Sequence, residues 1–131
     1  MKPETRFTII AIVIIVGIVA LVASGVSYLE PQESVTVRIP QGTSVPDCEN
    51  ANACYDPFEV AILVGGEVVW INDDSEAHTV TSGTTQGGPD AFFDSGIFMK
   101  GTDYYYRFES PGTFNYFCKL HPWMEGKVRV S

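Results

Sequence analysis

The first 29 residues contain one long run of apolar side chains. Residues 7–29 are predominantly apolar, and the centre of the run, residues 9–23, has no polar side chain. A helix needs about 20 predominantly apolar residues to span a bilayer, and a helix buried in a small β domain is rarely apolar on every side. The pattern therefore predicts one N-terminal transmembrane helix within residues 1–29.

Charged residues on either side of this run predict its orientation. Lys2 and Arg6 precede it, whereas Glu30 and Glu33 follow it. The positive-inside rule then places the N-terminus in the cytoplasm and the C-terminal domain outside, on the periplasmic or pseudoperiplasmic face of a cell membrane. The alternative is a cleaved signal peptide, with a small-residue cleavage site at Ala23-Ser24-Gly25, although the apolar run is longer than the usual signal-peptide core. Both interpretations export the domain.

From residue 35 onward the pattern changes to short β-branched or aromatic segments. Residues 30–34 form a polar linker in which Pro31 ends any helix. The segments are separated by turns rich in Gly, Pro and Asn, and none has a helical period. Eight strands are expected, at residues 35–39, 58–63, 67–71, 78–81, 92–98, 104–108, 113–118 and 126–130. This spacing predicts an all-β domain, residues 35–131, folded as a Greek-key β-sandwich.

The charge balance narrows the choice of partners. The 131 residues include 16 Asp and Glu against 8 Lys and Arg, so the formal net charge is −8. Nucleic-acid binding needs clustered Lys and Arg, so this composition argues against it. A basic or polar protein partner is compatible with the charge.

The three cysteines differ in their surroundings. Cys48 and Cys54 lie in one long loop, residues 40–57, and Cys118 lies far from both in the sequence. Disulfides persist outside the cytoplasm, and the five residues between Cys48 and Cys54 leave a small loop that a disulfide can close. We therefore expect this pairing, with Cys118 free, although the sequence leaves other pairings open.

A short segment near the C-terminus holds three potential metal donors. Cys118, His121 and Met124 fall within seven residues, and His78 is the only other histidine of the chain. Singly, a Cys or a Met is usually a core residue, but the conjunction favours one site. One thiolate, two imidazoles and a weak axial thioether are the ligands of a blue-copper site, so one copper per chain is expected. Zinc is the rival metal, but structural zinc sites add further Cys or His instead of Met.

Several motifs together resemble one family. They are Trp70-Ile71-Asn72, His78-Thr79-Val80 and Gly112-x-Phe114-x-Tyr116-x-Cys118-x2-His121-Pro122-x-Met124-x-Gly126. This set is similar to the cupredoxins, and its Cys-x2-His-x2-Met spacing, with Pro directly after His, is closest to the amicyanin-like branch. The resemblance covers roughly residues 34–131. It implies a Greek-key sandwich with a type 1 copper bound by His78, Cys118, His121 and Met124.

The chain departs from that branch at three places. Leu120 stands where amicyanins have Pro, Trp123 is bulkier than the usual Phe, and the loop with Cys48 and Cys54 lies outside the common core. These departures leave the ligand assignment alone but change the expected solvent access and partner surface.

The resemblance, together with the predicted anchor, implies a carrier of single electrons between redox partners at the membrane surface, not an enzyme in its own right. It makes the His121 ring the electron port and places Pro122 and Trp123 in an apolar docking patch, unless Trp123 packs inward. Thr79, beside His78, is a candidate to support the ligands. The alternative function is a copper redox enzyme acting on a small molecule, such as a nitrogen oxide, at an open position on the copper.

Overall fold

The computed structural model describes residues 29–131. The predicted transmembrane helix therefore lies, apart from Leu29, outside the described residues. Within residues 29–131, no helix is long and apolar enough to cross a membrane.

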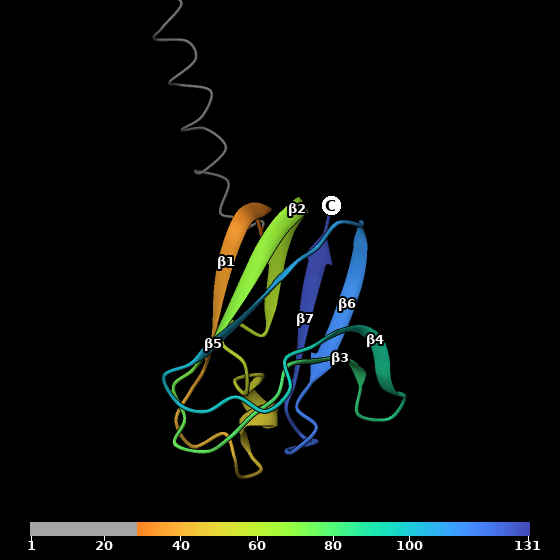
Figure 1. Ribbon diagram of the computed structural model, residues 1–131. Coiled ribbons are helices and arrows are strands. Elements are labelled where there is room, and N and C mark those ends of the chain that lie inside the picture. The colour runs from red at the N-terminus through yellow and green to blue at the C-terminus, as the bar shows by residue number, and fades with distance from the viewer. Residues whose placement is uncertain (1–28) are drawn as a thin grey trace, which may run out of the picture.

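Seven strands and one short 3-10 helix make up the described chain. They are β1 (Gln32–Ile39), η1 (Cys48–Ala51), β2 (Glu59–Asn72), β3 (Thr81–Thr84), β4 (Gly88–Asp94), β5 (Asp103–Arg107), β6 (Gly112–Phe117) and β7 (Glu125–Val130). The hydrogen-bonded order is β1-β2-β7-β6-β3-β4, and β5 pairs with β2 (Figure 1). The prediction of a mostly β domain is confirmed for this part of the chain.

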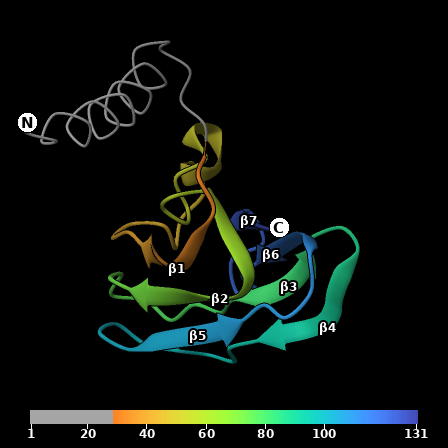
Figure 2. The ribbon, with the colours of Figure 1, turned by 90° about the horizontal axis from the view of Figure 1, so that it is seen from above.

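β2 belongs to both layers of the fold because it reverses direction. Its first arm, residues 59–62, runs parallel to β7, and its second arm, residues 67–71, runs antiparallel to β5. The ends of β7 and β5 both lie at the join, where Val64 N–H donates to Ser131 O and Gly65 N–H donates to Phe108 O. The chain thus approaches the join in the first arm and leaves it in the second. Figure 2 shows β1, β2 and β5 on one side and β6, β3 and β4 on the other.

Glycines allow this reversal. Gly65 has a φ of +85°, a backbone conformation that residues with a Cβ rarely adopt. Gly66 is required for a different reason, because a Cβ there would lie 2.7 Å from Leu63 O and 3.0 Å from Glu33 O. The sequence predicted two strands here, residues 58–63 and 67–71, separated by a turn. The structure places the same residues in the two arms of β2.

Aromatic side chains fill the space between the layers. Trp70, on the second arm of β2, is fully buried and meets Tyr116 of β6 edge-on, with ring centroids 5.3 Å apart. It also contacts Phe93 of β4 at 5.9 Å. Buried aromatic pairs of this kind add about 0.5–1.5 kcal/mol beyond the area they remove from water. These contacts therefore pack the second arm of β2 against β6 and β4.

Two boundaries differ from the sequence prediction. β1 begins at Gln32, inside the segment expected to be a linker. Residues 82–90, which lie between the strands expected at 78–81 and 92–98, contribute to the hairpin of β3 and β4. Polar contacts account for that hairpin, because Ser82 Oγ donates to Phe93 O and accepts from Phe93 N–H. Such pairing leaves no pattern of alternating apolar residues in the sequence.

The described chain starts and ends at the same end of the molecule, the top of Figure 1. β7 ends there, and β1, β6 and the second arm of β2 run away from it. The segments that follow these three strands, which contain the predicted metal ligands, therefore meet at the opposite end.

Candidate metal centre

Three donor atoms converge at the end of the molecule away from residue 29. His78 Nδ1 lies 3.9 Å from Cys118 Sγ, His121 Nδ1 lies 3.6 Å from the same sulfur, and the two Nδ1 atoms are 3.1 Å apart. His78 and Cys118 are fully buried, and His121 is half-buried. Residues forty positions apart in the sequence thus form one cluster of soft and borderline donors.

A tight turn after β6 brings two of these donors together with Met124. Cys118 N–H donates to Met124 O at 3.2 Å, and Met124 N–H donates to His121 O at 2.9 Å. The Met124 side chain is fully buried. His78 comes from a separate segment, which is fixed by a backbone bridge to Phe98.

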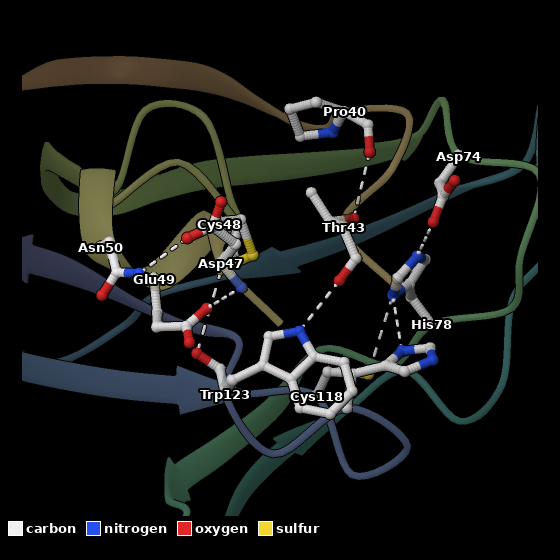
Figure 3. Close-up of a disulfide and its surroundings, with 12 residues drawn as sticks. Pro40, Thr43, Asp47, Cys48, Glu49, Asn50, Asp74, His78, Cys118 and Trp123 are labelled. Carbon is white, nitrogen blue, oxygen red and sulfur yellow. Dashed lines mark hydrogen bonds and ion pairs between the residues drawn. A yellow bond between two sulfur atoms is a disulfide. The ribbon is translucent and has the colours of Figure 1, made fainter. Parts of the chain in front are cut away.

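Asp74 orients the His78 ring. Its Oδ2 lies 2.7 Å from His78 Nε2, and both side chains are buried (Figure 3). When Nε2 donates this bond from the neutral ring, the free lone pair is on Nδ1 and points into the cluster. Burial raises the pKa of Asp74, but hydrogen bonds from His78 and from Gly42 N–H outweigh it, so the pKa is lowered and the carboxylate stays ionised.

Thr79 supports the sulfur. Its backbone N–H donates to Cys118 Sγ at 3.3 Å, and its Oγ1 accepts from Lys119 N–H at 2.9 Å. Burial raises the pKa of the Cys118 thiol, but hydrogen bonds from His78 and from Thr79 N–H outweigh it, so the pKa is lowered. A lowered pKa favours the thiolate, the form that binds metals.

Pro122 and Trp123, the two residues predicted to form a docking patch, lie at the surface edge of the donor cluster. Pro122 is exposed, and its carbonyl accepts from Thr85 Oγ1 at 2.6 Å. Trp123 is half-buried, and its Nε1–H donates to Thr43 O at 3.0 Å (Figure 3). Its ring centroid lies 5.4 Å from that of His121. Trp123 therefore packs against residues 40–57 on one side and against a donor ring on the other. Burial and the neighbouring His78 lower the pKa of His121, so its ring stays neutral.

Cys48 and Cys54 are joined by a disulfide with a Cα–Cα distance of 5.0 Å, and Cys118 is the free cysteine among the described residues. This is the pairing expected from the sequence.

Two residues near the candidate ligands, Asp74 and Tyr55, were not predicted from the sequence. Asp74 carries a local signal, a carboxylate four residues before a donor His. Tyr55 reaches Thr79 across 24 residues of sequence, so no short pattern could have indicated it.

The cluster fits a single transition-metal ion. Nitrogen and sulfur donors lie about 2.0–2.3 Å from such an ion, so three of them around it stand roughly 3.5–4 Å apart. The observed separations of 3.1 to 3.9 Å are close to this range. A structural zinc site usually has four Cys or His ligands, and both histidines of the chain are already in the cluster. The donor set therefore fits zinc less well than copper. Thiolate, imidazole and thioether donors suit copper.

Comparison with known proteins agrees with this chemistry. Residues 43–131 match the model of the copper binding proteins of the plastocyanin/azurin family. Amicyanin from Paracoccus versutus is 31% identical over 125 residues, which cover 88% of this chain and 92% of that protein. Amicyanin from Paracoccus denitrificans is 32% identical over 103 residues, 77% of this chain and 76% of that protein.

A solved structure shows the same similarity. The purple cupredoxin from Nitrosopumilus maritimus superposes with a TM-score of 0.67 at 33% identity, over 74% of this chain and 99% of that one. The donor geometry, the matched residues and the shared fold agree, so the chain belongs to the plastocyanin/azurin family of copper binding proteins.

Proposed function

We propose that this protein is a type 1 copper electron carrier that passes single electrons between redox partners outside the cytoplasm. The observation that carries the proposal is the cluster of His78 Nδ1, Cys118 Sγ and His121 Nδ1, held within 3.1 to 3.9 Å of one another by hydrogen bonds from other residues. These three atoms would bind the copper, and Met124, which is fully buried and belongs to the same turn, would supply the weak axial sulfur.

Bound copper supplies the one-electron couple, and the protein supplies a site that barely moves. The Asp74 carboxylate fixes the His78 ring, and Thr79 N–H fixes the Cys118 sulfur. The turn from Cys118 to Met124 is closed by its own backbone hydrogen bonds. Because these restraints hold in either oxidation state, little rearrangement accompanies the gain or loss of an electron.

Electrons would enter and leave through His121. Among the three donors it alone is not fully buried, and the side chain before it, Leu120, is 44% exposed. Leu120 and the exposed Pro122 form an apolar surface beside His121, on which a redox protein could dock transiently. The net charge of −8 favours a basic partner.

The test is the visible spectrum of the copper-loaded protein. The wild type should show an intense thiolate-to-copper band, and Cys118→Ser should abolish it. Met124→Leu should keep the band but shift it and raise the reduction potential, because loss of an axial donor destabilises the oxidised ion more. The matched control is Met99→Leu, which changes an exposed methionine. A Cys118→Ser protein that kept the band would contradict the ligand assignment.

The alternative function, a copper redox enzyme, predicts that the visible spectrum changes when a small ligand is added. An open copper position would bind azide or a nitrogen oxide, so the band of the oxidised protein would change on addition. For a carrier whose cysteine, one histidine and methionine are all fully buried, we expect no change.

We further propose that residues 7–29 anchor the protein in a membrane with the domain outside. The apolar run and its flanking charges support this, as does the start of β1 at the end of the domain opposite the metal centre. The full chain should resist carbonate extraction from membranes, and protease added to cells stripped of their outer layer should digest the domain. Release of a shortened chain into the medium or periplasm would instead indicate a cleaved signal peptide.

A further inference from the structure

Residues 40–57, called the strap below, contact three of the residues that surround the candidate ligands. Gly42 N–H donates to Asp74 Oδ1 at 3.1 Å, and Thr43 O accepts from Trp123 Nε1–H at 3.0 Å. The hydroxyl of Tyr55 donates to Thr79 O at 2.7 Å. The first two contacts come from the backbone, so Tyr55 is the side chain whose identity matters most here.

The strap holds Tyr55 firmly. Its backbone is pinned on one side by the Cys48–Cys54 disulfide and on the other by Asp56, which exchanges two hydrogen bonds of 2.8 Å with Arg38 of β1. Its side chain is fully buried, and its ring meets Tyr116 edge-on at 4.8 Å. A phenol held in this way can restrain the group to which it donates.

That group is the peptide that follows Thr79. Its carbonyl oxygen accepts from Tyr55, and its N–H, that of Val80, donates to Ser95 Oγ at 2.7 Å. The peptide before Thr79 is held by the backbone bridge between His78 and Phe98. With both flanking peptides fixed, Thr79 N–H is aimed at Cys118 Sγ, 3.3 Å away.

We propose that the Tyr55 hydroxyl is a positioning group for the copper site, fixing Thr79 so that its N–H donates to the Cys118 sulfur. The inference rests on the proposed ligation of copper by Cys118. The sulfur keeps more negative charge when the copper is reduced, so a well-aligned N–H stabilises the reduced state more than the oxidised one. Tyr55 therefore raises the reduction potential through Thr79.

The experiment replaces Tyr55 by Phe in the full chain, which removes only the hydroxyl. The matched control is Tyr116→Phe, because Tyr116 is the adjacent buried phenol and its oxygen has no hydrogen-bond partner within residues 29–131. Tyr55→Phe should lower the reduction potential and shift the thiolate-to-copper band. In the metal-free protein it should speed exchange of the Thr79 amide proton about five- to tenfold, the factor expected for loss of one hydrogen bond. Tyr116→Phe should change none of the three.

A second variant tests the same peptide from its other side. Ser95→Ala removes the acceptor of Val80 N–H and should move all three measurements in the direction of Tyr55→Phe. The proposal is overturned if Tyr55→Phe lowers the melting temperature while leaving the potential, the band and Thr79 exchange at wild-type values, or if Tyr116→Phe matches it. Absence of the band from wild-type protein would refute the copper ligation, and amide exchange would still report on the positioning.

Discussion

At the scale of single residues, the site depends on buried polar groups that are each satisfied. Asp74 accepts from the backbone N–H groups of Gly42 and Ser75 while its other oxygen meets His78. A buried carboxylate is tolerated only with such partners, because an unpaired charge in the interior costs several kcal/mol, on the order of 5. The contact with the carboxylate occupies His78 Nε2 and leaves Nδ1 facing the cluster.

Replacing Asp74 by Asn should weaken copper binding about 10- to 100-fold, because the His78 ring loses the charged acceptor that fixes its tautomer. Competition with a chelator of known affinity would measure this. Asp73→Asn is the matched control, since Asp73 is the neighbouring carboxylate but is exposed and paired with Arg38. Equal losses in the two variants would mean that net charge, not the contact with His78, controls affinity.

At the scale of elements, β7 and β6 fit closely where they approach the metal centre. Gly126 pairs with Tyr116 in the register of the two strands, and a Cβ at Gly126 would overlap the Tyr116 ring. Tyr116 is fixed in turn by Trp70 and Tyr55. The glycine is therefore required by close approach and not by its backbone angles.

Gly126→Ala should destabilise the protein by about 1–3 kcal/mol, the usual cost of overpacking a core. Denaturant unfolding of the metal-free protein would measure it. Gly101→Ala is an informative comparison, because Gly101 has open space at its Cβ position but a positive φ. Gly101→Ala should lower the free energy of unfolding by less, through backbone strain alone. If Gly126→Ala lowers the free energy of unfolding no more than Gly101→Ala does, the contact with the Tyr116 ring is not what requires glycine at residue 126.

Elements with apolar alternation could be predicted from the sequence, whereas elements held by polar contacts could not. The aromatic and β-branched segments that became β5, β6 and β7 were located to within about two residues. The strands expected at residues 78–81 and 92–98 overlap β3 and β4 only at their ends, because Thr81 and Ser82 pair with β4 through their hydroxyls and not through apolar faces. The cluster of His78, Cys118 and His121 was accessible because few residue types can serve as donors. Tyr55 was not, since its partner is fixed only by the fold.

At the scale of the whole molecule, the strap ties β1 to the metal end. The Cys48–Cys54 disulfide closes it, and Cys54 Sγ lies 3.9 Å from Trp123 O. The chain thus adds a covalent restraint next to a turn that carries two of the three clustered donors.

Changing both Cys48 and Cys54 to Ala should lower the free energy of unfolding by about 2 kcal/mol, a small value because the closed loop is short. Unfolding in denaturant, with and without copper, would measure the loss. If the strap supports the site, the double variant should also release copper faster than wild type. Loss of stability with unchanged copper release would show that the strap stabilises the fold without supporting the site.

The start of β1 at Gln32, directly after the apolar run, sets how far the carrier could reach. Only Glu30 and Pro31 separate the apolar run from β1, and two residues span at most about 7 Å. With the proposed anchor, the domain would stand almost directly on the bilayer, with its metal end one domain length above the surface. It would exchange electrons within a thin layer parallel to the membrane, so its partners would be those whose own redox centres are held at, or can diffuse to, that height.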